Sequence, residues 1–163
     1  MINLFRFGGL LALFLCSSAY AGDIQIQNAW ARATAPGQDA ASVDLTITSK
    51  HAAALVGVSS PAAETAALHS MQMEGGMMRM REVASLDIPP GKALNLRASG
   101  HHLMLMGLKE PLKEGQTVPL TLNFRVGKMG MMKVKTRARV IALTAPAPVM
   151  GNSGDQKMNM KMH

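Results

Sequence analysis

Cysteine is almost absent from this 163-residue chain, and the single one, Cys16, lies in an apolar N-terminal stretch. Arg6 is the only charged residue before Asp23; "GGLLALFLCSS" follows it, and then "AYA" at residues 19–21 supplies small residues. This order is typical of a secretory signal peptide over residues 1–21, with cleavage expected after Ala21. The apolar run is shorter than the roughly 20 residues that span a bilayer, so no stable membrane insertion is expected after cleavage.

The mature chain that remains has no cysteine, which excludes disulfides and a blue-copper electron-transfer site, since that site needs a thiolate. A lipid anchor on Cys16 is not expected either, because the residue before it, Leu15, is not small. A domain without disulfides depends on its hydrophobic core, and about 140 residues can build one.

Aromatic residues are also scarce: only Trp30 and Phe124 follow the signal segment. The mature chain keeps 16 basic and 10 acidic residues, a formal charge near +6. This excess favours acidic partners or a solvated basic surface. Nucleic acid is not an expected partner, because two aromatics provide no stacking platform for bases. No G-x-S-x-G motif is present, so nothing indicates a hydrolase.

Short segments with alternating apolar residues, separated by Pro, Gly and Ser turns, make up most of the chain. This pattern predicts an all-β fold, a β-sandwich or barrel, in one domain over residues 22–143. The expected strands cover 23–33, 41–49, 53–60, 65–73, 77–83, 92–98, 101–108, 117–126 and 131–143. Residues 144–163, "TAPAPVMGNSGDQKMNMKMH", show no strand pattern and are predicted to be a disordered, flexible tail.

Methionine is abundant, with 15 in the chain, but none occurs between Met1 and Met71. The groups are Met71, Met73, Met77, Met78 and Met80; Met104 and Met106; Met129, Met131 and Met132; and Met150, Met158, Met160 and Met162. Methionine commonly fills cores, and a β-rich interaction domain whose methionines merely pack is one alternative. Core packing does not explain why the strands before residue 60 use Val, Leu and Ile instead.

Histidines accompany three of these groups. His69 precedes the first, His101 and His102 open the second, and His163 ends the last, whereas His51 is an ordinary loop residue. In the strand "HHLMLMGL", His102, Met104 and Met106 share one face, and His101 shares the other with Leu103 and Leu105. A register slip of one residue would exchange the two histidines, so which of them faces a ligand stays open.

Thioether and imidazole donors together suit Cu(I) far better than Mg²⁺, Ca²⁺ or Mn²⁺. Zinc prefers thiolate, imidazole and carboxylate. Residues i and i+2 of a strand lie roughly 6.6 Å apart, so His102 and Met104 can lean over one ion while other ligands arrive from elsewhere.

The spacing His69-x10-Met80-x21-His102-x-Met104 resembles the motif of the periplasmic copper chaperone family, the PCuAC-like proteins. Its flanks are similar too, in "NAWARATAPG", "LVGVSSPAAETAALHSM", "MRMREV" and "GHHLMLMGLKEPLKEGQTVPLTLNF". The similarity runs from about Asn28 to Val140. It implies a cupredoxin-like Greek-key fold that binds Cu(I) outside the cytoplasm.

Carried over from the family, the metal ligands would be His69, Met80, His102 and Met104, with Met71, Met78 and Met106 as neighbours or substitutes. The resemblance also implies a second site in the C-terminal tail, formed here by Met150, Met158, Met160, Met162 and His163. With only one histidine, this tail favours weak Cu(I) capture over a firm Cu(II) site.

The implied function is a periplasmic chaperone, not an enzyme, that delivers Cu(I) to an acceptor such as a cytochrome oxidase subunit or another copper chaperone. The alternative is a storage or resistance protein that sequesters copper, because storage and delivery need the same ligands.

Overall fold

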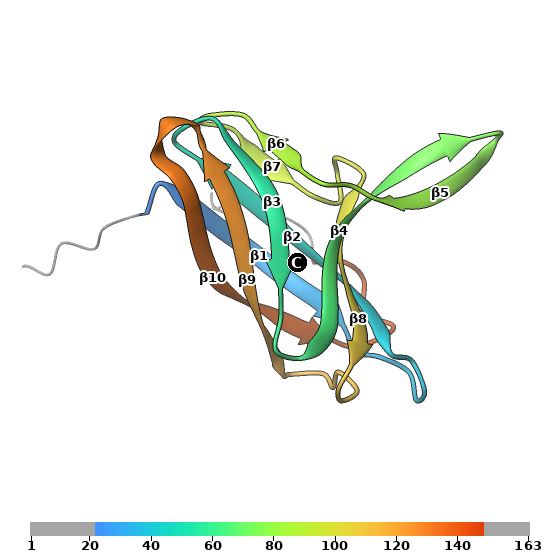
Figure 1. Ribbon diagram of the computed structural model, residues 1–163. Helices are drawn as coiled ribbons and strands as arrows, with labels where there is room; N and C mark the ends of the chain where they lie inside the picture. The colour runs from blue at the N-terminus through green and yellow to red at the C-terminus, as the bar shows by residue number, and fades with distance from the viewer. Residues whose placement is uncertain (1–21, 149–163) are drawn as a thin grey trace, which may run out of the picture.

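The computed structural model of the protein describes residues 22–148 and consists almost entirely of β-strands (Figure 1). The strands are β1 (Ile24–Arg32), β2 (Ala40–Ser49), β3 (Ala53–Ser59), β4 (Ala63–Glu74), β5 (Met77–Glu82), β6 (Leu86–Ile88), β7 (Ala93–Asn95), β8 (His101–Leu108), β9 (Thr117–Val126) and β10 (Gly130–Ile141). A 3₁₀ turn, η1 (Gly127–Met129), joins β9 to β10. The all-β, cupredoxin-like fold expected from the sequence is confirmed.

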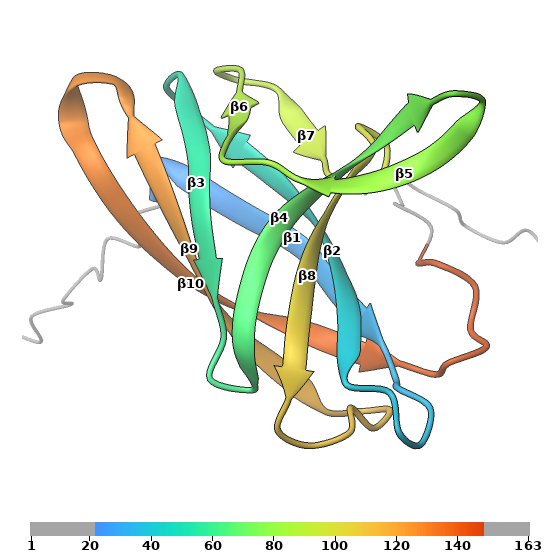
Figure 2. The same ribbon diagram turned by 45° about the vertical axis from the view of Figure 1, so that its right-hand side comes forward.

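All the strands belong to one ten-stranded sheet, in which β5-β4-β8-β2-β1-β10-β9-β3-β6 are neighbours in that order and β7 pairs with β2. The sheet coils around itself, and its two edges are β5 and β6 (Figure 2). The end of the β4–β5 hairpin projects beyond the rest of the sheet in both views.

Two details differ from the sequence prediction. β6 was not expected, and the strand predicted over 92–98 is only three residues long. Its second half forms turns instead: the amide of His101 donates to the carbonyl of Leu96, and Gly100 has a φ of 74°. Leu94 and Leu96 alternate as in a strand, but Leu96 reaches the core from a turn.

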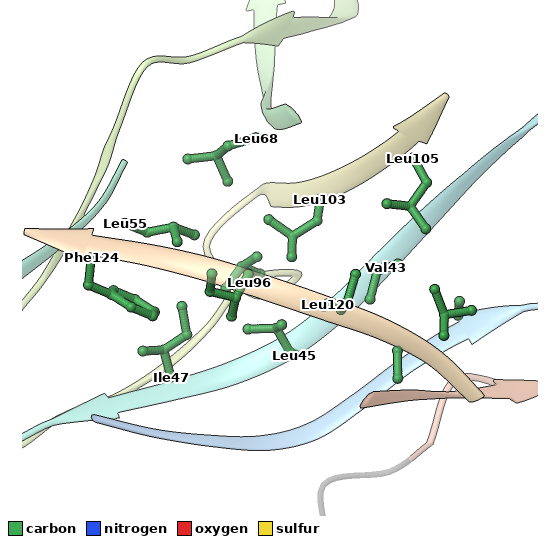
Figure 3. Packing of buried hydrophobic residues seen from close by; sticks show 14 of the residues in the cluster. Val43, Leu45, Ile47, Leu55, Leu68, Leu96, Leu103, Leu105, Leu120 and Phe124 are labelled. Atoms are coloured by element: carbon green, nitrogen blue, oxygen red, sulfur yellow. The ribbon is translucent and has the colours of Figure 1, made fainter. Parts of the chain in front are cut away.

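The core is formed by the inward-facing residues of the coiled sheet (Figure 3). Phe124 belongs to one cluster with aliphatic side chains such as Leu45, Leu103 and Leu122, and all four are fully buried. Among the described residues the only methionine that packs against this cluster is Met132. Core filling therefore does not explain the methionines of β4, β5 and β8, and they are available for another role.

Candidate metal centre

The two faces of β8 differ in burial, as the sequence predicted. Leu103 and Leu105 are fully buried, whereas His102, Met104 and Met106 lie half-buried on the outer face. Because strand side chains alternate, the burial of the two leucines fixes the outward direction of the other three.

The β4–β5 hairpin has its register set by Gly75 and Gly76, whose φ angles are 57° and 80°. Two consecutive residues with positive φ make the type I′ turn that closes two-residue hairpins. Glu74 therefore pairs with Met77, and counting back from the turn pairs Met73 with Met78, Met71 with Met80, and His69 with Glu82.

His69 of β4 lies directly opposite His102 of β8. Directly opposed residues have their Cβ atoms about 5 Å apart and point to the same face. His101 instead pairs with Ser70 on the inner face, and its Nδ1 atom lies 3.1 Å from the Ser99 hydroxyl. The register thus shows that His102, and not His101, shares a face with His69.

Methionines lie on both sides of this histidine row, on the same outer face. Met104 is opposite Ala67, one row away in one direction, and Met80 is opposite Met71, one row away in the other. Each row is about 6.6 Å from the next, so the Met104 and Met80 rows are about 13 Å apart along β4. Met104 and Met80 therefore flank the histidine row from opposite sides.

The remaining neighbours expected from the sequence also lie on this face. Met71 is in the same row as Met80, but it is on β4, which lies next to β8. The register therefore places Met71 at least as near to the histidines as Met80. Met78 is one row further toward the hairpin turn, and Met106 lies opposite Thr65, beyond Met104.

Asp44 of the neighbouring strand β2 contacts the ring of His102, with its Oδ1 atom 3.1 Å from the Nδ1 atom of His102. Asp44 is buried. A carboxylate accepts hydrogen bonds, so Nδ1 carries the proton and Nε2 keeps its lone pair for a metal. Sequence analysis missed this residue; the available signal was an acidic residue inside the otherwise apolar and hydroxylic strand "ASVDLTITS".

His69 has no such partner. Its Nδ1 atom is buried and makes no hydrogen bond to any of the described residues. Leaving a buried polar atom without a partner is costly, and a bound metal or ordered water is a common explanation. The unpaired nitrogen beside His102 therefore fits a ligand at this row.

The outer face carries imidazole and thioether donors, and Glu82, directly opposite His69, adds a carboxylate at the end of the histidine row. Within residues 22–148, no group of three or more His, Cys, Asp or Glu side chains is placed to hold a metal ion. Nor does that part of the chain contain a helix long and apolar enough to cross a membrane. The expected signal peptide and the expected tail site, with Met150, Met158, Met160, Met162 and His163, lie outside the described residues.

In fold the protein belongs with the PCuAC domains. The apo PCuAC domain of PmoF1 matches it with a TM-score of 0.59 and 24% identity, covering 74% of this chain and 95% of that one. The sequence itself matches the family described as "Putative lipoprotein LpqE-like" over residues 24–136, and the chain belongs to this family. The resemblance to PCuAC-like proteins indicated by the sequence motif is confirmed.

Two further relatives have higher identity. Lxx21020 of Leifsonia xyli subsp. xyli, which carries the same lipoprotein description, is 37% identical over 118 residues, which cover 72% of this chain and 71% of that protein. The solution structure of CuI-DR1885 from Deinococcus radiodurans is 34% identical, with a TM-score of 0.57, and covers 77% of this chain and 83% of that one. The family and Lxx21020 are both described as putative lipoproteins. Cys16 lies outside the described residues, so the absence of a lipid anchor on it stays a prediction.

Proposed function

We propose that the protein is an exported, periplasmic copper chaperone that binds Cu(I) through His69, Met80, His102 and Met104. The observation that carries this proposal is the direct pairing of His69 with His102 on an outer face. Thioether rows lie on both sides of the pair. The copper ion is the cargo of this site.

The chemistry of the donors favours the monovalent ion. Thioethers are soft and neutral, imidazole is borderline, and this combination suits Cu(I). Thioethers need no deprotonation and cannot form disulfides, which fits an oxidising compartment. The similarity to CuI-DR1885, whose name states its copper(I) form, supports the same cargo here.

The exposure of the site supports delivery of copper, because the ligands of an acceptor protein can reach it. Asp44 fixes the ring of His102, so that Nε2 is presented on the outer face without rearrangement. Met80 is 46% exposed on the projecting hairpin, where ligands of an acceptor can replace its sulfur first. The half-buried histidines and Met104 are then displaced in turn. Only coordination bonds are exchanged, and no catalysis is proposed.

The proposed acceptor is a copper-binding protein, either a cytochrome oxidase subunit or another copper chaperone. Sequestration for storage or resistance is the alternative, and it differs in the off-rate of copper rather than in the ligands. A second, weaker position in the tail is part of the proposal. In support, Pro148, the last described residue, lines the same surface pocket as Asp44, which contacts His102.

An anaerobic Cu(I) titration against a chromogenic chelator tests the ligand assignment. His102→Ala/Met104→Ala should weaken the tight site, whereas Met129→Ala/Met131→Ala, at the β9–β10 turn, should leave it unchanged. Unchanged affinity in the first double variant would refute the assignment. Mixing copper-loaded protein with candidate oxidase subunits and measuring which one gains metal then separates delivery from storage.

A further inference from the structure

The β4–β5 hairpin has two chemically different faces. One face carries Arg79 and Arg81 around Glu74, with Arg81 Nη2 2.6 Å and 2.7 Å from the two carboxylate oxygens. The other face carries only methionines beyond the histidine row: Met71 pairs with Met80, and Met73 pairs with Met78. The hairpin thus presents two adjacent pairs of thioethers beyond the histidine row, with Glu74, Arg79 and Arg81 on the opposite side. Glu82, which pairs with His69, is the charged residue on the methionine side.

These methionines do not contribute to the core. Met73 is 67% exposed, Met78 57% and Met80 46%, and the hairpin that carries them extends away from the coiled sheet (Figure 1). Burying a methionine side chain stabilises the folded protein, and exposed methionines do not contribute this stabilisation. Exposed apolar side chains grouped on one surface are typical of an interaction site.

We propose that Met73 and Met78 form a second Cu(I) position, joined to the histidine site by the Met71–Met80 row between them, through which copper enters and leaves the histidine site. This inference rests on the proposed function and extends it, because it adds a site made only of thioethers, separate from the histidine row. It assigns the outer end of the hairpin as the place where donor and acceptor proteins exchange copper.

The geometry gives a continuous series of donors. Directly paired residues have Cβ atoms about 5 Å apart, so the two sulfur atoms of one row can share an ion. Successive rows are about 6.6 Å apart, which puts the Met73–Met78 row about 13 Å from the histidine pair. The Met71–Met80 row lies between them and can pass copper in either direction.

The outer position and the histidine row should differ in their affinity for Cu(I), because their donors differ. A position made only of thioethers selects Cu(I), but a thioether is a weaker donor than the imidazole nitrogens of the histidine row. It therefore holds Cu(I) more weakly and releases it faster. A weak outer position beside a tight inner one suits exchange with a partner, because the first ligand substitutions occur at the exposed end.

The test is methyl NMR on the full mature chain labelled with ¹³C at the methionine methyl groups, since Cu(I) is diamagnetic. The first equivalent of Cu(I), added anaerobically, should shift the methyl signal of Met104. Up to three equivalents should then shift the signals of Met73 and Met78. The methyl signals of Met129 and Met131, which are 56% and 65% exposed, should not move and serve as the matched reference.

A kinetic arm uses Met73→Ala, with Met131→Ala, at a similarly exposed position, as its control. The first variant should transfer copper to a chelator about tenfold more slowly while the affinity of the histidine site is unchanged. If Met104 responds but Met73 and Met78 do not, the second position is refuted and the proposed function stands. If Met104 does not respond either, both are refuted.

Discussion

His102 and Asp44 are joined by a contact of 3.1 Å between the imidazole Nδ1 atom and a carboxylate oxygen, although 58 positions separate them in the chain. The contact links β8 to β2 on the outer face, at the row where His69 faces His102. A proton on Nδ1 would satisfy this contact and leave the lone pair of Nε2 for the proposed copper site.

Asp44→Ala should therefore weaken Cu(I) binding by about 10- to 100-fold, which is typical for loss of the partner that orients a ligating histidine. Asp44→Asn should retain most of the affinity, because its amide oxygen still accepts from Nδ1. Competition titration measures both, and ¹⁵N NMR of the His102 ring reports the tautomer. Asp87→Ala, at the exposed position of β6, is the control; an Asp44→Ala protein with the affinity of the control would contradict the positioning role.

The two adjacent histidines should differ sharply in function. His102→Ala removes a donor from the outer face and should lower Cu(I) affinity by about tenfold or more. His101→Ala should leave the affinity unchanged, because that ring lies on the inner face beside Ser99. Equal losses from the two substitutions would show that the register of β8 differs from the one described.

The effect of a substitution on the free energy of unfolding should depend on how buried the residue is, and not on whether its side chain is a proposed copper ligand. Leu103→Ala should destabilise the apoprotein by about 2–5 kcal/mol, because it leaves a cavity in a fully buried site. Met78→Ala should change the free energy of unfolding by no more than about 0.5 kcal/mol, since the side chain is largely exposed. Urea denaturation measures both values, and a large loss in Met78→Ala would show that the hairpin methionines have a packing role after all.

Copper should stabilise the folded protein. At free Cu(I) one hundred times the dissociation constant, the gain is about 2.7 kcal/mol, less any binding of copper to methionines of the unfolded chain. His102→Ala/Met104→Ala should lose most of this gain when unfolded anaerobically at the same copper concentration. An equal gain in wild type and variant would mean that copper binds elsewhere.

Much of this arrangement was predictable because strands have a period of two. The alternation in "HHLMLMGL" places His102 and Met104 opposite Leu103, as the structure shows. The Gly75–Gly76 turn carries further information: a two-residue loop alone determines that Met71 pairs with Met80.

The long-range pairings could not be obtained in this way. His69 faces His102 because β4 lies beside β8, and Asp44 supports the ring because β2 lies on the other side of β8. Strand order depends on how the whole sheet coils and buries Leu45, Leu103 and Phe124 together, and no local pattern specifies it. β6 was missed for a related reason: three residues are too few for alternation to be recognised.

X-ray absorption spectroscopy at the copper edge, on the protein loaded anaerobically with one equivalent, tests the histidine–methionine site most directly. We expect a Cu(I) edge and a mixed shell of imidazole nitrogen and thioether sulfur, with the nitrogen contribution falling in both His69→Ala and His102→Ala. A shell of oxygen and nitrogen without sulfur, or one that neither substitution alters, would contradict the account.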